Sequence, residues 1–201
     1  MEKIIVIPDS FKGSMSSIEV ADILSSSIDK YMSTNVVKVP IADGGEGSVD
    51  CFLQIREGKK VYIKVHSPDY KIIDAYFGLL EDNTAVIEIA ESSGLTKQNQ
   101  KHPVDSNTYG FGELIKKALD YHCKKISLCL GGSATTDCAC GMACALGVCF
   151  YDDSHNAFIP TGASLSKVKS IDITSLDSRI HETIFIIMSD VENPLYGPNY
   201  S

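Results

Sequence analysis

Short runs of β-branched and other apolar residues, most of them closely followed by a turn, recur along the chain and predict buried strands. Such runs occupy residues 3–7, 36–41, 126–130 and 183–188. Each is too short for a typical helix, and continuous apolar runs are typical of strands that are covered on both faces. Segments with the apolar spacing of helices lie between several of them. This alternation predicts an α/β protein built on an open, parallel, doubly wound sheet.

Three segments are predicted to be helices, and two of them begin with a capping signal. Ser16 precedes the first, and Glu19 stands three residues later, which is the spacing of a capping box. A second helix is predicted near residues 49–55. A third is predicted to begin after Thr108, as its cap, and to continue to about residue 122.

The pattern changes at residues 61–90, where apolar and polar residues alternate and two further strand-like runs follow. The intervals between these runs are too short for crossover helices, so antiparallel pairing is expected. We therefore expect a second, smaller α+β domain, a lid over residues 61–103, inserted into a parallel domain formed by residues 1–60 and 104–201.

Composition limits the classes of function. The chain has 201 residues, of which 44% are hydrophobic and 22% charged, and its formal net charge is −8. An acidic protein is a poor partner for nucleic acid or for an anionic membrane surface, so neither is expected. The N-terminal residues do not resemble a signal peptide, and no apolar segment approaches the roughly 20 residues of a membrane span. Together with an odd number of cysteines in apolar contexts, these features favour a cytoplasmic protein.

Three of the seven cysteines lie close together, at Cys138, Cys140 and Cys144. Their spacing lacks the second cysteine pair or histidine arm of a zinc site. Small buried hydrophobic residues are therefore the favoured interpretation. A metal or redox protein remains a third hypothesis, which metal analysis would test.

The run at 126–130 leads into Gly131, Gly132 and Ser133, and a segment of small residues with helix propensity follows as far as Gly147. A strand, a glycine-rich turn and a helix in this order direct free backbone N–H groups at an anion such as phosphate. Asp137 beside this turn can hold a cation or accept a proton. The alternative is an ordinary tight turn between strand and helix.

Acidic residues follow all four predicted parallel strands, at Asp9, Asp43, Asp137 and Asp190. In open α/β sheets ligands bind beyond the carboxyl ends of the strands, so these loops are expected to converge on one site. Carboxylates beside glycine turns suit a Mg²⁺–nucleotide complex, and Lys12 can neutralise a carboxylate or a phosphoryl group. Taken singly, each acidic residue is more often a turn or helix-capping residue. The sequence contains neither a P-loop motif nor a dinucleotide-binding glycine motif after its first strand.

At these same loops the chain resembles the bacterial-type glycerate kinases, which phosphorylate D-glycerate with ATP. The matching stretches are residues 8–22, 39–50, 87–95, 108–115, 131–142 and 189–199. The resemblance implies two α/β domains with the active site in the cleft between them, ATP and Mg²⁺ as cofactors, and 2-phosphoglycerate as product. A homodimer is a further expectation.

The resemblance also places functional residues in three groups. Substrate binding is expected of Ser10, Phe11, Asp43, Gly44, Gly45 and Glu46. Phosphate or nucleotide binding is expected of Gly131, Gly132, Ser133 and Asn193. Catalysis is expected of Lys12, Asp137 and Asp190, of which Asp137 and Asp190 are also the expected metal ligands.

The chain departs from the family in composition and length. The family's third motif usually reads GGSATNDGGAGM, whereas Thr136 here replaces Asn, and Cys138, Ala139 and Cys140 replace Gly-Gly-Ala. Losing these glycines is expected to restrict the approach of a phosphate to the backbone. Family members also continue beyond the last matched motif. We therefore expect both domains to be incomplete and these 201 residues to lack kinase turnover alone; a remnant that binds ligand without turnover is the alternative function.

Overall fold

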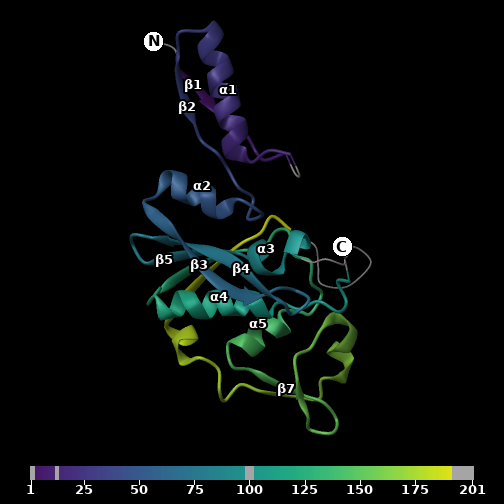
Figure 1. The fold of residues 1–201 in the computed structure, drawn as a ribbon. Coiled ribbons are helices and arrows are strands. Elements are labelled where there is room, and N and C mark those ends of the chain that lie inside the picture. The colour runs from purple at the N-terminus through teal and green to yellow at the C-terminus, as the bar shows by residue number, and fades with distance from the viewer. Residues whose placement is uncertain (1–2, 12–13, 98–101, 192–201) are drawn as a thin grey trace.

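A computed structural model describes residues 3–11, 14–97 and 102–191. Its N-terminal unit consists of β1 (Lys3–Val6), α1 (Ser17–Tyr31) and β2 (Asn35–Lys38), and it projects from the rest of the molecule (Figure 1). β1 and β2 pair in parallel as a two-stranded sheet. The predicted capping box of α1 is confirmed, because Ser16 Oγ accepts from Glu19 N at 3.2 Å and Glu19 Oε2 accepts from Ser16 N at 2.8 Å.

The N-terminal unit is covered by its helix on one face only. Val6, Val20 and Ala21 are buried where α1 packs on the two strands. The alternate residues Ile5 and Ile7 are each 56% exposed, so the opposite face of the sheet is bare. A two-stranded sheet with a single covering helix has little core of its own.

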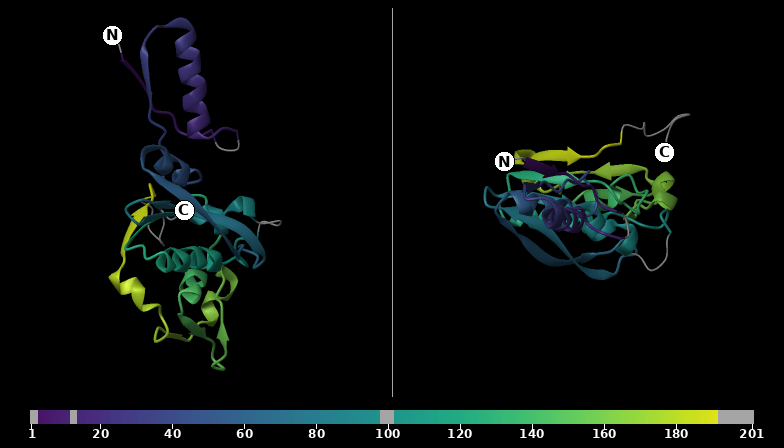
Figure 2. Two further views of the ribbon diagram at one scale, coloured as in Figure 1. Left: turned by 60° about the vertical axis from the view of Figure 1, so that its left-hand side comes forward. Right: turned by 90° about the horizontal axis from the view of Figure 1, so that it is seen from above.

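The central sheet has five strands in the order β10-β6-β5-β4-β3 (Figures 1 and 2). The strands β5, β6 and β10 are parallel, whereas β3 pairs with β4, and β4 with β5, antiparallel. Their bounds are β3 (Gly58–His66), β4 (Ile72–Leu80), β5 (Thr84–Glu88), β6 (Lys125–Cys129) and β10 (Ile184–Met188).

Helices cover this sheet on both faces. Ala85 and Ile87 of β5 join the core beneath α4 (Tyr109–Asp120), which buries Phe111, Leu114 and Ile115 among others. Val86, which points the other way, packs with Val49 of α2 (Ser48–Ile55). Every residue of β5 is buried, as is typical of a strand that is covered on both faces.

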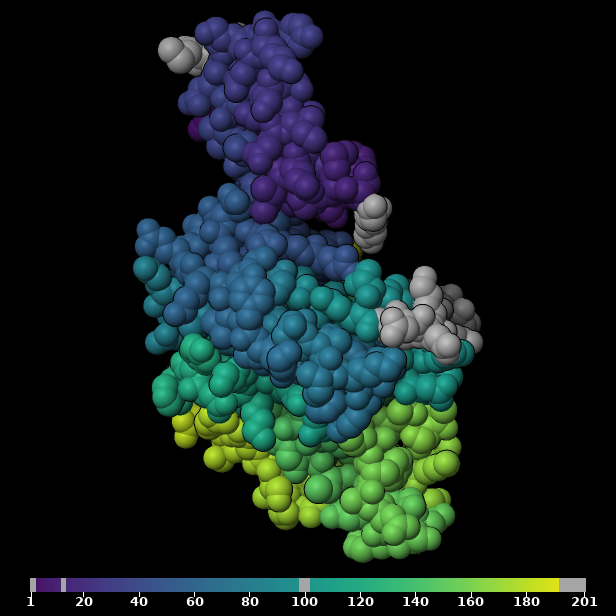
Figure 3. Space-filling model, in the orientation of Figure 1, coloured from purple at the N-terminus to yellow at the C-terminus, as the bar shows by residue number. Residues whose placement is uncertain are grey.

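The remaining elements follow β5 in the sequence, as α3 and η1 do, or lie between β6 and β10. A three-stranded antiparallel sheet in the order β8-β7-β9 forms the lower part of the molecule in Figure 1, and the same chain segment forms the green base in Figure 3. Bounds are α3 (Ile89–Ser93), η1 (Leu95–Lys97), α5 (Cys140–Ala145), β7 (Cys149–Tyr151), β8 (Ala157–Phe158), η2 (Gly162–Lys167), β9 (Ser170–Asp172) and η3 (Ser178–Glu182). None of the helices within the described ranges combines the length and apolarity needed to cross a membrane.

The α/β class is confirmed, but the expectation that all four apolar runs share one parallel sheet is wrong. The runs at 3–7 and 36–41 form the separate two-stranded sheet, and only the later two join the five-stranded one. The antiparallel strands β3 and β4 complete that sheet, because the buried strand β5 pairs with β4 on one side and with β6 on the other. The sheet is therefore mixed. The expected domains, residues 1–60 with 104–201 against 61–103, consequently do not coincide with the sheets.

Candidate functional site

The parallel strands β5, β6 and β10 end side by side and define one edge of the sheet, here called the carboxyl edge. Glu88, Cys129 and Met188 stand in register as the last residues of the three strands. The chain continues from them into α3, into residues 131–133 and into Ser189 and Asp190. Of the four loops predicted to converge, only those at Asp137 and Asp190 follow strands of this sheet, because the strands before Asp9 and Asp43 form the separate two-stranded sheet.

Two glycine-bearing loops, residues 43–47 and residues 131–133, touch at this edge. Gly131 N donates to Gly44 O at 2.8 Å. A Cβ atom on Gly131 would lie 2.7 Å from Gly45 Cα, and one on Gly44 would lie 2.6 Å from Met188 O. Gly44 also has a φ of +90°, a left-handed conformation that favours glycine. These glycines allow the two backbones to come closer than side chains would permit.

Gly132 lies on the outer side of this contact. A Cβ atom on Gly132 would approach Glu46 Cγ to 3.8 Å, so this backbone lies beside the exposed Glu46. Ser133 is exposed, and its hydroxyl lies 3.0 Å from Thr135 Oγ1. The structure thus brings Gly44, Gly45, Glu46 and the residues 131–133 together, in keeping with the sequence prediction.

Glu88 lies beneath the 43–47 loop and was not singled out from the sequence. It is 1% exposed. Its Oε1 accepts from Val49 N at 2.6 Å, and its Oε2 accepts from Gly47 N at 3.1 Å. Burial raises the pKa of Glu88 to about 7, against the lowering effect of these two hydrogen bonds. The signal was available in the sequence, since Glu88 is a lone charged residue within the apolar run of residues 85–90.

Asp137 is buried beneath the second loop, with 1% of its surface exposed. Its Oδ2 accepts from the N–H and the hydroxyl of Thr108, each at 2.8 Å, and from Gly141 N at 2.9 Å. The carboxylate thus ties the starts of α4 and α5 together. Thr108 precedes α4 as predicted, although its hydroxyl donates to Asp137 instead of capping its own helix.

Cys138 and Ala139 adopt left-handed backbone conformations, with φ of 50° and 60°. They stand where the family motif has two glycines. A side chain at such φ values costs about 1–2 kcal/mol per residue. The turn therefore keeps the left-handed conformation that favours glycine, although its residues are Cys138 and Ala139.

Three acidic residues of the predicted site are exposed: Asp43, Glu46 and Asp190. Asp43 Oδ1 accepts from Gly45 N at 2.8 Å, which shapes the 43–47 loop. Mg²⁺ is commonly held by one or two carboxylates together with phosphate oxygens, and exposed carboxylates beside a glycine loop fit that donor set. Across the described ranges, no group of three or more His, Cys, Asp or Glu side chains is arranged to hold a metal ion on its own.

The first predicted loop belongs to the N-terminal unit. Ser10 N donates to Asp9 Oδ1 at 2.7 Å, and Phe11 is 58% exposed. The start of α1 approaches α2, where Ser17 Oγ lies 3.3 Å from Cys51 Sγ. Lys12 and Asn193, for which catalytic and phosphate-binding roles are predicted, lie outside the described residues.

Two of the three clustered cysteines, Cys140 and Cys144, pack as hydrophobic residues, whereas Cys138 is exposed and the expectation of a buried role is wrong for it. Cys140 lies with Val148 and Phe150 in a small core, and Cys144 packs against it. Burial raises the pKa of Cys144 to about 12, which keeps this thiol neutral.

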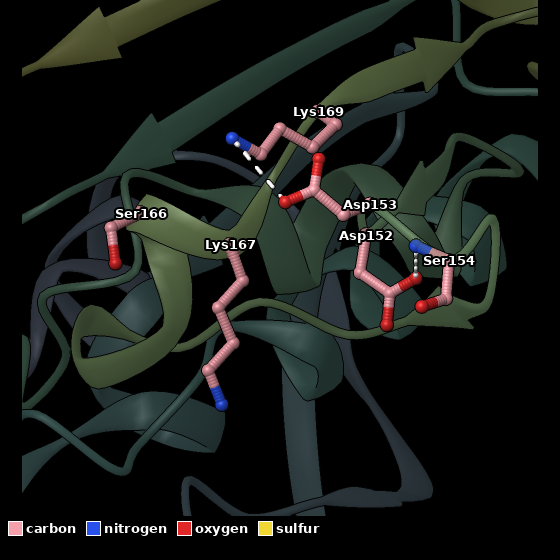
Figure 4. Close-up of a pocket in the computed structure, with 6 residues that line it drawn as sticks. All are labelled: Asp152, Asp153, Ser154, Ser166, Lys167 and Lys169. Carbon is pink, nitrogen blue, oxygen red and sulfur yellow. Dashed lines mark hydrogen bonds and ion pairs between the residues drawn. The ribbon is translucent and has the colours of Figure 1, made fainter.

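A hollow of about 270 Å³ lies elsewhere, between the β7–β8 turn and η2 (Figure 4). It is lined by Asp152, Asp153, Ser154, Ser166, Lys167 and Lys169. Lys169 pairs with Asp153 at 3.6 Å, and Asp152 accepts from Ser154 N at 2.9 Å. None of its lining residues belongs to the predicted site, so the hollow does not define that site.

Comparison with known proteins gives a consistent result. Residues 4–201 match the profile described as "Glycerate kinase family". The chain is 39% identical over 200 residues to a glycerate kinase of Bacillus subtilis (strain 168), covering 98% of this chain and 52% of that protein. It is 36% identical over 201 residues to a glycerate 2-kinase of Escherichia coli (strain K12), covering 98% and 53%.

A solved structure shares the fold. The crystal structure of a protein called glycerate kinase 2, from Salmonella typhimurium LT2, superimposes with a TM-score of 0.84 at 37% identity. The match covers 98% of this chain and 54% of that one. The chain therefore spans about half the length of the relatives that it matches.

Proposed function

The chain belongs to the glycerate kinase family, and from this premise we propose that its carboxyl edge forms part of a site for ATP-dependent phosphorylation of D-glycerate to 2-phosphoglycerate. The observation that carries the proposal is the contact between the 43–47 and 131–133 loops, made through Gly131 N and Gly44 O at 2.8 Å. Two glycine-bearing loops packed against each other expose backbone to an anion at close range. Their exposed carboxylates are suited to a cation bound with that anion.

In this proposal the 131–133 loop binds the phosphates of ATP, and the 43–47 loop, with Ser10 and Phe11, binds glycerate. Phosphoryl transfer depends mostly on positioning and on stabilising charge. Mg²⁺, when bound, would neutralise charge on the phosphate oxygens, and Asp190 and Glu46 are the exposed carboxylates that would help to hold it. Lys12 is proposed to neutralise the substrate carboxylate or the transferring group.

We assign Asp137 a different role within this proposal. A carboxylate that is 1% exposed and accepts three hydrogen bonds at 2.8–2.9 Å holds the ends of two helices. Its proposed part is to fix the 131–138 turn, whereas Asp190, which is exposed, stays the proposed base or metal ligand.

The alternative function is ligand binding without turnover. The bare face of the two-stranded sheet favours this alternative, because Ile5 and Ile7 are each 56% exposed and the N-terminal unit has little core of its own. Rate depends strongly on how the substrate is oriented, so a unit with little core favours binding over turnover.

A coupled ADP-release assay with D-glycerate separates the two functions. Turnover that requires both ATP and D-glycerate supports the kinase, with lactate as a matched acid that lacks one hydroxyl. Binding of ATP without ADP release supports the alternative. Absence of both binding and release would refute a nucleotide site on this chain.

A further inference from the structure

Glu88 is a buried acidic residue at the carboxyl edge, and the proposed chemistry does not use it. Its carboxylate accepts from Val49 N at 2.6 Å and from Gly47 N at 3.1 Å. Both N–H groups belong to the start of α2, where Gly47 occupies the capping position with a φ of +87° and has no side chain. Glu88 therefore supplies, from a distant strand, the acceptor that a capping side chain would normally provide.

The start of α2 is also the end of the 43–47 loop. Ser48 Oγ donates to Gly45 O at 2.7 Å, which ties the first residue of α2 to the middle of the loop. On its other side the loop accepts from Gly131 N through Gly44 O. A shift of the start of α2 would therefore change the contact between the two glycine-bearing loops.

We propose that Glu88 is a positioning residue of the carboxyl edge, whose ionised form holds the start of α2, and with it the 43–47 loop, against the 131–133 loop. An ionised carboxylate offers acceptors to both N–H groups. A protonated carboxyl group has one carbonyl oxygen, which accepts well from one N–H group. Its hydroxyl oxygen is a weak acceptor, so the hydrogen bond from the other N–H group becomes weaker. Protonation therefore loosens one of the two bonds that position the loop.

The surroundings of Glu88 place this change near neutral pH. Burial is the main cause that raises the pKa of Glu88 to about 7; the neighbouring carboxylates of Glu91 and Asp50 contribute to this rise, and the two backbone N–H groups act against it. Among the described residues, Cys51 on α2, Tyr76 on β4 and Cys129 on β6 also interact with Glu88. The pKa of each of these three groups is itself raised, so all three remain neutral over pH 6–8.

The test is a pH titration of the ¹⁵N-labelled chain, in which the amide signals of Gly47 and Val49 are followed from pH 5 to 8.5. We expect both signals to shift with a common midpoint near 7. Glu88→Gln should abolish this shift, and Glu91→Gln, which removes a neighbouring negative charge, should lower the midpoint. Glu81→Gln is the matched control, since Glu81 is exposed on the turn before β5. A midpoint below about 5, or an unchanged titration in Glu88→Gln, overturns the proposal.

The consequence for ligand binding rests on the proposed function, and a second measurement keeps the two separate. With MgATP as the probe, the ratio of affinities at pH 8 and pH 6 should be about tenfold larger in the wild-type chain than in Glu88→Gln, as expected for one charge-assisted hydrogen bond. If the amides titrate as expected but MgATP does not bind at either pH, the nucleotide site is refuted and the role of Glu88 in holding the loop stands. If MgATP binds with the same ratio in both proteins, the positioning role in ligand binding is refuted. The wild-type and Glu91→Gln titrations decide the proposal even if Glu88→Gln fails to fold.

Discussion

Gly131 donates its backbone N–H to the carbonyl oxygen of Gly44 at 2.8 Å, and neither residue has room for a side chain. The contact joins the loop that follows β6 to the loop that precedes α2. Both loops thus come together at the carboxyl edge although they lie far apart in the sequence. The proposed phosphate and substrate sites depend on this one contact.

Gly131→Ala should therefore separate the two loops. The added methyl group would meet backbone atoms of Gly45, which cannot move away as a flexible side chain can, and overpacking of this kind costs about 1–3 kcal/mol. We expect a lower free energy of unfolding in urea together with weaker MgATP binding. Gly47→Ala is a comparison for backbone strain without a clash, because its φ is +87° but no atom lies within 4 Å of an added Cβ. Equal MgATP affinity in Gly131→Ala and wild type would show that the contact does not shape the site.

Restoring glycine at the left-handed positions should stabilise the chain. Ala139→Gly relieves a conformational cost of about 1–2 kcal/mol but adds entropy to the unfolded state, so a net gain of about 0.5–1 kcal/mol is expected. Cys138→Gly should behave in the same way. Ala143→Gly, at a regular position within α5, should instead destabilise by about 1 kcal/mol. Losses of similar size at all three positions would argue against backbone strain in this turn.

Asp137 and Asp190 should respond differently to replacement by Asn. Asp137→Asn replaces a buried carboxylate that accepts several hydrogen bonds with an amide that accepts them less well. We expect a loss of about 2–3 kcal/mol in the free energy of unfolding. Asp190→Asn should leave stability nearly unchanged, because Asp190 is exposed, and should raise the Mg²⁺ concentration needed for half-maximal nucleotide binding. An Mg²⁺ effect in Asp137→Asn without loss of stability would reverse the two assignments.

The raised pKa of Glu88 also predicts how stability depends on pH. In the unfolded chain the side chain loses its proton near its ordinary pKa of 4.5, whereas in the folded chain it keeps the proton until about pH 7. The folded state thus binds more protons between these values, so this contribution to stability is fully present below pH 4.5 and is lost as pH rises to 7. The full change is on the order of 3 kcal/mol.

Urea unfolding at several pH values checks this dependence. The difference in stability between wild type and Glu88→Gln should change by that amount between pH 4.5 and 7.5. Comparing the two proteins cancels the other carboxylates, such as Asp82 and Asp172, whose pKa values are lowered and which act at lower pH. A difference that stays constant with pH would show that Glu88 is ionised throughout.

Local patterns in the sequence predicted the elements better than their arrangement. The capping residues Ser16 and Glu19 are a short-range signal, and the structure confirms them. Sheet membership depends on long-range pairing, which an apolar run does not specify, and this is why residues 3–7 were expected in the wrong sheet. The apolar pattern of residues 61–90 does not mark where its last strand ends, because Ile89 and Ala90 are apolar yet begin the short helix α3.

In the candidate site, too, local signals were predicted better than long-range contacts. The 43–47 and 131–133 loops were expected to lie together because their strands were expected in one sheet; the loops do touch, although the run at 36–41 lies in another sheet. Acidic residues beside those loops all suggested chemistry, but their burial decides between roles: Asp137 is enclosed by hydrogen-bond donors, whereas Asp190 is exposed. Glu88 was missed although it is the lone charged residue of an apolar run, because that signal does not say what the carboxylate contacts, and its partners are backbone N–H groups.

The most direct test of the central claim is to map MgATP on the ¹⁵N-labelled chain by amide chemical-shift changes. The account predicts that the largest changes fall on Gly44, Gly45, Gly47 and the residues 131–133, and that Gly131→Ala weakens them. Changes confined to the hollow around Asp152 and Lys169, or absent at saturating MgATP, would contradict a nucleotide site at the carboxyl edge.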